Sequence, residues 1–419
     1  MSSEWKEVKL KDVCSYISRG ITPSYDEFGV IVINQKCIRD GKISFEQARF
    51  TNPDNRKIPN DKLLQLFDIL VNSTGVGTLG RVAQIKKIEN NVTVDSHVTI
   101  VRPNESVNSE FIGYALFNKQ NEIESLAQGS TGQTELSRER LGNEIIFPIP
   151  CSCGVQEKIV SILSVIDEKI ELNNKINDNL EQMAQAIFKS WFIDFEPFKN
   201  GKFVESELGE IPIGWQVIRI GDLPLIITDY VANGSFASLK ENVTLLETPD
   251  YAVFIRNVDL KAGNFNKYVD EHSYRFLSKS VLFGGEVIIS NVGDVGSVFL
   301  CPHLSQPMTL GNNIIMLTMN GKKSRNYFFY LLFKHSYGAE LIKSITGGSA
   351  QPKFNKTDFR SLRVIMPPSE IMDKFIAIIE CLFQQQANIE QKSIHLTTLR
   401  DILLPHLMSG KIDVSQVKI

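Results

Sequence analysis

Three closely spaced glycines are the first residues of this chain whose spacing suggests chemistry. Gly75-x-Gly77-x-x-Gly80 has the spacing of a dinucleotide-binding fingerprint, follows an apolar run, and precedes Asp95, which lies twenty residues after Gly75. That fingerprint needs a helix N-terminus directly after the glycines, because the helix faces the pyrophosphate. The residues that follow, Arg81–Ile85, are typical of a strand instead. We therefore interpret the glycines as a turn between strands and expect no cofactor there.

Other residue types that carry chemistry form no recognisable site. Cys151 and Cys153 are the only close pair among six scattered cysteines, and one pair cannot supply the four ligands of a structural zinc ion. The six histidines are dispersed, so we expect each to be structural or on the surface. The sequence contains no Walker loop, no His-Glu-x-x-His and no nucleophile elbow, and Met366–Ser369 lacks the amide and the aromatic residue of an amino-methyltransferase motif. These observations predict no catalytic residue, no metal and no cofactor.

Composition sets the frame in which any function must fit. The chain has 419 residues, 42% hydrophobic and 22% charged, which is typical of a soluble globular protein with more than one domain. We find no signal peptide and no membrane span, and with scattered cysteines we expect a reduced, cytoplasmic protein. The formal charge of −3 argues against a protein that simply coats DNA. A DNA reader of this composition must gather its cations on one face or share DNA contact with a partner.

An internal repeat indicates how the chain is organised. Trp5 and the residues after it recur 210 residues later from Trp215, and the loop Gly129–Gln133 recurs as Gly347–Gln351. Each loop is followed about fifteen residues later by an apolar run that ends in proline, and then by a long helical stretch. The predicted order is therefore domain, helix, domain, helix.

The inner part of each copy predicts a mixed α+β domain rich in loops. Runs of β-branched and apolar residues predict strands at Val92–Val94, His97–Val101, Val287–Ile289 and Ile314–Leu317. Apolar residues at three- and four-residue spacing predict short helices at Ser109–Asn118 and Ser324–His335.

The two long stretches predict helices with narrow apolar seams. The first seam runs from Ile159, with Lys169 and Asn173 as interruptions, and the second is interrupted by Gln386 and Ser393. The apolar positions of the first seam are Ile162, Ile166, Ile176, Leu180, Met183 and Ile187. Those of the second seam are Phe375, Ile379, Leu382, Ile389, Leu396 and Leu403. Such heptad-like stripes suit two helices packed against each other, and 30 residues of helix form a rod of roughly 45 Å. Each helix packing only on its own domain is the alternative, but the repeat favours an antiparallel pair that bridges two like domains.

The helical segments resemble those of a known family. Gln156–Val160 with Ile166–Ile170 is similar to the start of the central spacer of Type I restriction–modification specificity subunits, and Leu180–Pro197 to its end. Leu399–Ile412 resembles the second conserved region of that family. The resemblance covers the whole chain in arrangement and is specific only in the helices.

The resemblance implies a fold and a working model. Two tandem target-recognition domains, related by a pseudo-two-fold repeat, each read one half of a split site on double-stranded DNA, and two long antiparallel spacer helices set the gap. The expected segments are 1–155, 156–200, 201–368 and 369–419. Two modification (methyltransferase) subunits are the implied partners and supply the S-adenosylmethionine site and adenine methylation, while restriction subunits are a further partner that the resemblance leaves open. Because the two domains differ strongly in sequence, we expect an asymmetric target.

Polar residues in glycine-rich loops are the candidates for DNA contact, because arginine and glutamine make bidentate base contacts and glycine lets the backbone approach phosphate. They are Arg19, Thr22, Ser73, Thr74, Ser130, Thr131, Gln133, Asn291, Ser349, Gln351 and Lys353, with Lys356 and Arg360 as phosphate contacts. Solvated turns are the alternative. Phe188, Trp191 and Phe192 look exposed at a helix end, and we expect them either to pack the helix on its neighbours or to dock a modification subunit.

Three other functions compete with this interpretation. A specificity subunit of a different methylation-based system would have the same sequence features, since the difference lies in its partners. A nucleotide-dependent enzyme would use the Gly75 turn and would bind cofactor as an isolated chain. A coiled-coil scaffold would not explain two similar, loop-rich domains and would show no salt-dependent affinity for DNA.

Overall fold

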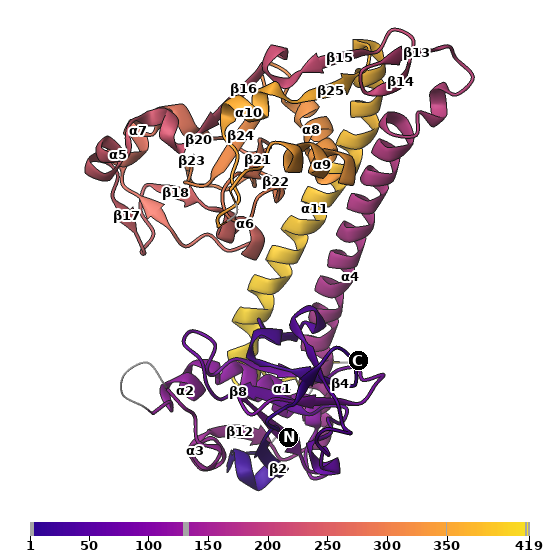
Figure 1. Cartoon of the computed structure of the whole chain (residues 1–419). Helices are drawn as coiled ribbons and strands as arrows, with labels where there is room; N and C mark the ends of the chain where they lie inside the picture. The colour runs from indigo at the N-terminus through magenta and orange to yellow at the C-terminus, as the bar shows by residue number, and fades with distance from the viewer. Residues whose placement is uncertain (1–3, 129–133, 349, 415–416, 418–419) are drawn as a thin grey trace. The chain divides into compact units, whose positions relative to one another are not determined.

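The chain forms two compact units, and the boundary between them falls inside both long helices. The computed structural model describes residues 4–128, 134–348, 350–414 and 417. Unit 1 comprises Met1–Asn173 with Gln391–Ile419, and unit 2 comprises Asn174–Glu390. The long helices are α4 (Cys153–Phe192) and α11 (Ser369–Met408), as Figure 1 shows. The compact units therefore cut across both of the expected spacer segments.

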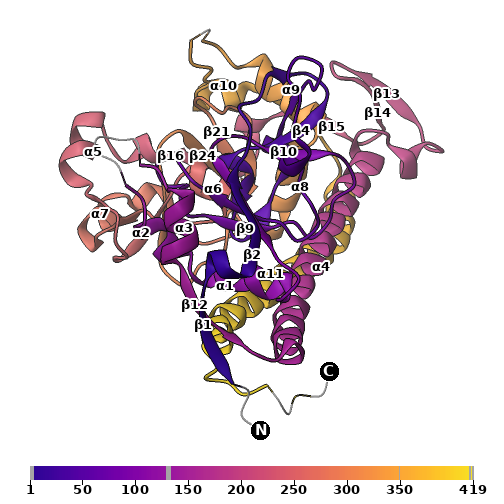
Figure 2. The ribbon, with the colours of Figure 1, turned by 90° about the horizontal axis from the view of Figure 1, so that it is seen from below.

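Unit 1 contains two four-stranded sheets and a separate pair of strands that joins the two ends of the domain. The first sheet is antiparallel and has the order β2 (Cys14–Arg19), β11 (Val98–Pro103), β8 (Ile69–Asn72), β9 (Val82–Gln84). The second has the order β10 (Val92–Val94), β4 (Val30–Ile33), β7 (Arg49–Thr51), β3 (Tyr25–Asp26), and its β10–β4 pair is parallel. Strand β1 (Trp5–Lys9) pairs with β12 (Ile146–Pro150) directly before α4, and the two strands lie together in Figure 2. This pairing fastens the first strand of the domain to the residues that lead into the long helix.

Helix α1 illustrates why the short elements of unit 1 form where the sequence predicts them. It spans Ser109–Asn118, as predicted, and Asn108 caps it by accepting a hydrogen bond from the Phe111 amide. Its apolar positions, Phe111, Ile112 and Leu116 among them, are fully buried. Other short elements of unit 1 are α2 (Gln120–Ser125), α3 (Arg138–Glu144), β5 (Ile38–Arg39) and β6 (Lys42–Ile43).

Unit 2 repeats this topology, which confirms the predicted repeat at the level of strand order. Its antiparallel sheet is β16 (Leu225–Asp229), β24 (Ile314–Met319), β21 (Val287–Ser290), β22 (Val298–Leu300). Its second sheet is β17 (Leu245–Leu246), β19 (Tyr268–Val269), β18 (Ala252–Ile255), β23 (Met308–Leu310), β20 (Val281–Leu282), again with one parallel pair, β18–β23. Strands β15 (Gln216–Arg219) and β25 (Arg363–Met366) pair as β1 and β12 do, and β13 (Phe203–Ser206) pairs with β14 (Gly209–Pro212).

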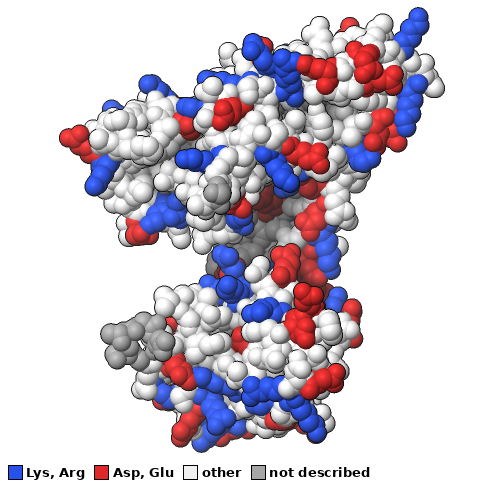
Figure 3. Space-filling view, viewed as in Figure 1, with Lys and Arg blue, Asp and Glu red and all other residues white. Residues whose placement is uncertain are grey.

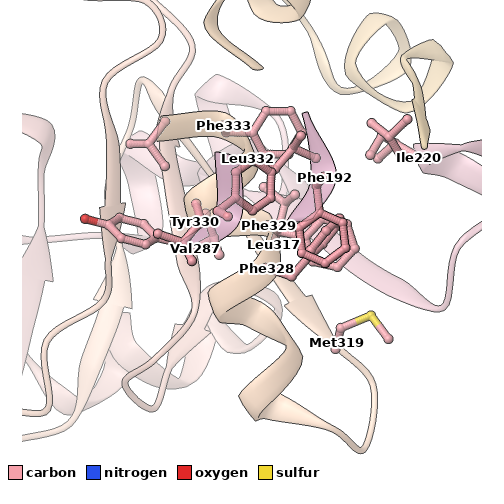
Figure 4. Packing of buried hydrophobic residues seen from close by; sticks show 14 of the residues in the cluster. Phe192, Ile220, Val287, Leu317, Met319, Phe328, Phe329, Tyr330, Leu332 and Phe333 are labelled. Carbon is pink, nitrogen blue, oxygen red and sulfur yellow. The ribbon is translucent and has the colours of Figure 1, made fainter. Parts of the chain in front are cut away.

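The helices of unit 2 correspond to those of unit 1, with additions. Helix α8 (Asn326–Lys334) lies within the predicted range 324–335 and takes the place of α1. The others are α9 (Ser336–Ser344), α10 (Lys356–Ser361), α5 (Phe236–Asn242), α6 (Asn257–Ala262) and α7 (Glu271–Phe276). Aromatic and apolar side chains of α8 pack with Val287 and Leu317 of the sheet and with Phe192 of α4 (Figure 4).

Within each unit the two long helices pack in antiparallel fashion. In unit 1, Arg400 of α11 donates to Asp167 of α4 at 3.1 Å, and Leu404 and Leu407 share a core with Ile159 and Leu163. In unit 2, the rings of Phe192 and Phe375 lie 4.6 Å apart, centroid to centroid. Each long helix therefore contributes both to its neighbouring domain and to the other helix.

The seam of α4 differs from its prediction in one respect and explains its interruption. Met183 is 51% exposed, and Ala184 is buried in its place. Successive residues of an α-helix point about 100° apart, and here Ala184 faces the core of unit 2 while Met183 faces away from it. Asn173, expected as an interruption, is buried, and its Nδ2 donates to Oγ of Ser393, the interruption in the other helix, at 3.1 Å. The two predicted breaks in the seams thus meet as a polar pair.

Candidate nucleic-acid interface

The glycine motif of unit 1 forms the turn between β8 and β9, as predicted. The two strands are antiparallel, and β9 begins two residues after Gly80, where the fingerprint would need a helix. Gly75, Gly77 and Gly80 all have positive φ, of 102°, 71° and 85°. A Cβ atom at Gly75 would lie 2.3 Å from the Gln35 Oε1 atom, so this position accepts only glycine without a shift of its neighbour. The turn is therefore a shaped and braced loop at the end of a sheet.

The residues that flank the second polar loop of unit 1 lie directly beside this turn. Gln128 and Glu135 exchange backbone hydrogen bonds of 3.0 and 2.9 Å that close the base of the loop, and Leu136 N donates to Ser73 O at 2.8 Å. Thr74 and Glu135 form an isolated antiparallel β-bridge through their backbones. Ser130, Thr131 and Gln133, predicted DNA contacts in this loop, lie outside the described residues.

Two more predicted residues, Arg19 and Thr22, lie at the same end of unit 1. Arg19 ends β2, donates to Leu136 O at 2.8 Å and pairs with Glu135, which keeps its side chain only 27% exposed. Thr22 is exposed and follows Ile21, which bridges to Asp95. The structure therefore brings Arg19 and Thr22 to one surface with Thr74, which lies more than fifty residues later in the sequence.

One residue on this surface, His97, was expected only as a structural or surface residue. It is exposed in the turn between β10 and β11, and its Nδ1 shares a 2.7 Å hydrogen bond with Thr74 Oγ1. The strand prediction placed His97 at the start of β11, but its link to Thr74 depends on a contact across 23 residues that no local pattern indicates.

Ser73 cannot make the DNA contact that was predicted for it. Its side chain is fully buried, and its Oγ lies 2.6 Å from Thr99 Oγ1. The strand alternation of β8 continues into the turn, so that Ser73 points inward and its neighbour Thr74 points outward. A polar residue type in a glycine-rich segment was therefore an insufficient signal of exposure.

Unit 2 repeats this framework with the same backbone hydrogen bonds. Gly347 and Lys353 exchange hydrogen bonds of 2.9 and 2.8 Å, and Val292 bridges to Lys353. Phe354 N donates to Asn291 O at 3.1 Å. Gln351 and Lys353 are exposed on this loop. Ser349, also predicted to contact DNA, lies outside the described residues.

The other predicted residues of unit 2 hold the framework together. Asn291 Nδ2 donates to Phe354 O at 3.2 Å. Lys356 Nζ pairs with Asp229 at 2.8 Å, and Arg360 donates to Ile227 O at 3.1 Å. These two cations thus fasten α10 to β16, so a phosphate contact by either would compete with an existing interaction.

The two frameworks present different side chains at matching positions. Arg19 of unit 1 corresponds to Asp229, and Thr74 to Val292. Glu135 corresponds to Lys353, which reverses the sign of the charge at the base of the loop. In Figure 3, basic side chains of unit 1 gather over the end where β2 and α3 are labelled in Figure 1, among acidic ones. Among the described residues, no group of three or more His, Cys, Asp or Glu is arranged to hold a metal ion.

Comparison with known proteins identifies the family. Residues 2–182 and 212–398 match the family model of the Type I restriction modification DNA specificity domain. The chain belongs to the Type I restriction–modification specificity family. The Type I restriction enzyme MjaIX specificity subunit of Methanocaldococcus jannaschii is 31% identical over 99% of this chain and 95% of its own length. The HindI specificity subunit of Haemophilus influenzae is 25% identical over 98% of this chain and 100% of its own length.

A solved structure shares the fold of this family member. The crystal structure of a Type I restriction–modification S subunit from M. genitalium covers 98% of this chain and 97% of its own, with 18% sequence identity and a TM-score of 0.52. The family assignment makes this chain a DNA-specificity component and not a catalytic subunit. No helix in the described part of the chain is long and apolar enough to cross a membrane.

The aromatic cluster at the end of α4 is part of the core of this specificity subunit. Phe188 is fully buried and Phe192 is 5% exposed, so the expectation that they look outward is wrong. The Phe192 ring lies 5.0 Å from that of Phe328 and 5.6 Å from that of Trp215, and Figure 4 shows it against α8. Trp191 is half-buried and makes an edge contact with Phe198 at 6.0 Å. Of the two predicted roles, packing therefore explains the phenylalanines.

A cavity of about 320 Å³ lies in unit 1 between the domain and the long helices. Tyr114 of α1 donates to Asp167 at 2.7 Å, and Arg400 of α11 binds the other oxygen of the same carboxylate at 3.1 Å. Burial, followed by the neighbouring Asp167 charge, raises the pKa of Tyr114 well above its usual range. The tyrosine thus remains a hydrogen-bond donor that ties α1 to α4.

Proposed function

We propose that this chain is the DNA-reading subunit of a Type I restriction–modification enzyme and that it recognises an asymmetric, two-part site in cytoplasmic DNA. One observation carries the proposal: a single loop framework occurs twice, with different outward side chains in the two copies. The same backbone scaffold with Arg19, Thr74 and Glu135 in one copy and Asp229, Val292 and Lys353 in the other suits two different half-sites.

The long helices are proposed to set the gap between the half-sites. Helix α4 enters the core of unit 1 through Ile159 and Leu163 and the core of unit 2 through Phe188 and Phe192. The hydrogen bond between the buried Asn173 and Ser393 supports a fixed register, because a polar residue in an apolar seam favours the one alignment in which it finds a partner.

Two modification subunits are proposed to supply S-adenosylmethionine binding and adenine methylation, and restriction subunits to join them. Exposed apolar side chains on the long helices are the proposed docking surface, since Phe188 and Phe192 are buried. In unit 1 they are Val165 and Leu172 of α4 with Ile394, Leu399 and Ile402 of α11. Large exposed apolar residues that gather on one element are typical of interfaces.

The test is to express the chain with the modification subunit encoded beside it and to map methylated adenines across a host genome. We expect a split motif that disappears without this chain. Replacing the segment Trp5–Pro150, which the β1–β12 pair closes, with that of a relative should change one half of the motif and leave the other half and the gap unchanged. The matched control is a chain in which Gln216–Met366 is replaced instead by the corresponding segment of the relative. That replacement should change only the other half of the methylated motif. Methylation that both replacements leave unaltered would refute the proposal.

A further inference from the structure

One apolar side chain stands out on the polar surface of unit 1. Val76, at the tip of the β8–β9 turn, is 83% exposed. It lies between Gly75 and Gly77, both with positive φ, and no atom of the described residues lies within 4 Å of the position that a Cβ at Gly77 would take. Among the residues that the structure describes, the tip therefore presents the valine isopropyl group to solvent.

The turn that carries Val76 is held in place on both sides. Leu79 is buried in the core of unit 1, and its amide donates to Gly75 O at 3.0 Å. Arg81 Nη2 donates to Gly77 O at 2.8 Å. A rigid turn loses little conformational entropy when its tip is bound, so that an exposed valine there is placed ready for contact.

The surroundings of the tip indicate what it contacts. Thr74, two residues earlier, bridges to Glu135 and shares a hydrogen bond with His97, so Val76 belongs to the surface proposed to read DNA. The β8–β9 hairpin lies at the edge of a four-stranded sheet, and its turn is the part that can approach the major groove. There the only apolar group on a base edge is the C5-methyl of thymine. An apolar hairpin tip among polar groups therefore matches the thymine methyl group better than the hydrogen-bonding groups of the other bases.

We infer that Val76 reads the C5-methyl group of a thymine in the first half-site, an inference that rests on the proposed DNA-reading function. The corresponding turn of unit 2 is two residues shorter and has Asp294 at its tip. Asp294 is held by Lys261 at 2.6 Å and by hydrogen bonds from Ser297 and Asn257. Unit 2 thus has a fixed acidic group where unit 1 has a free apolar one, so the methyl contact belongs to the first half-site alone.

The test removes the two methyl-bearing partners separately and together. The chain, assembled with its modification subunit, is titrated with duplexes that contain the mapped site, with each thymine in turn replaced by deoxyuridine. At one position of the first half-site the replacement should weaken binding by the wild type about fourfold, the factor that corresponds to burial of one methyl-sized group. The Val76→Ala variant should bind the thymine and deoxyuridine duplexes within about 1.5-fold of each other. The Val204→Ala variant, which alters an exposed valine on β13, should keep the fourfold ratio.

Each other outcome has a defined meaning. A deoxyuridine effect of equal size in the wild type and in Val76→Ala would overturn the inference, because another residue would then read the methyl group. A first half-site without a sensitive thymine would overturn it too, and Val76 would then be assigned to contact with a protein subunit. If the wild-type assembly shows no preference for the mapped site, the proposed function itself fails, and the inference fails with it.

Discussion

Replacing Phe192 with alanine tests whether the aromatic cluster of α4 is a core or a docking surface. The ring is 5% exposed and has ring neighbours at centroid distances of 4.6 Å (Phe375), 5.0 Å (Phe328) and 5.6 Å (Trp215). Truncation of such a side chain leaves a cavity and costs about 3–5 kcal/mol of unfolding free energy. With a urea m-value of about 2–3 kcal/mol per molar, the midpoint for unit 2 should fall by about 1–2 M.

Tryptophan fluorescence is a suitable assay for this change. Trp191 and Trp215 lie in unit 2 beside Phe192, and the third tryptophan, Trp5, lies in unit 1. Met183→Ala on the same helix is the matched control: its side chain is 51% exposed, and the change should stay within about 0.5 kcal/mol. A Phe192→Ala chain with an unchanged midpoint that no longer binds the modification subunit would refute the assignment of Phe192 to the core.

Three further predictions follow from single contacts. Tyr114→Phe removes the hydroxyl that donates to Asp167 and should lower the unfolding free energy of unit 1 by about 1–2 kcal/mol in urea denaturation; no change would mean that water replaces the hydroxyl. Burial raises the pKa of the Cys14 thiol from 9.0 to about 12, so the folded chain at pH 9 should be alkylated by iodoacetamide at the exposed Cys381 well before Cys14. Equal alkylation rates at Cys14 and Cys381 would contradict the burial of Cys14. Because the Cys14 thiol ionises at a lower pH in the unfolded chain than in the folded one, its ionisation should also lower the unfolding free energy as the pH rises from 9 to 12. Lys353→Ala should reduce the slope of log binding constant against log salt by about 0.9 if Lys353 contacts phosphate, and an unchanged slope would exclude that contact.

The repeat and the element types were predictable because they depend on local patterns. Runs of β-branched residues gave strands β10 and β21, and the three- and four-residue spacing at Ser109–Asn118 gave α1. Breaks in the helix seams were also visible in the sequence. That Asn173 and Ser393 bond to each other was not, since the register of two helices 220 residues apart depends on how both domains pack.

The candidate site was only partly predictable, because residue type does not decide which way a side chain points. Ser73 and Thr74 are adjacent hydroxyl residues before a glycine, yet one is buried and the other lies on the surface. Phe188 and Phe192 follow a polar helix segment, and their burial depends on α8, more than 130 residues away in the chain. His97 acquired its place on the surface from a hydrogen bond to Thr74 that joins two turns.

The composition of unit 1 has a consequence for how the protein is made. Leu404, Leu407 and Met408 complete a core that also contains Leu10 and Phe111, and the whole of unit 2 lies between these two sets of residues in the chain. During synthesis, the first domain therefore emerges from the ribosome before α11 has been made. Its core stays incomplete while unit 2 is synthesised and folds. During that interval its unpaired apolar surface is exposed to other nascent chains and to proteases. A premature stop after residue 390 would thus leave unit 2 complete and deprive the earlier-made domain of part of its core.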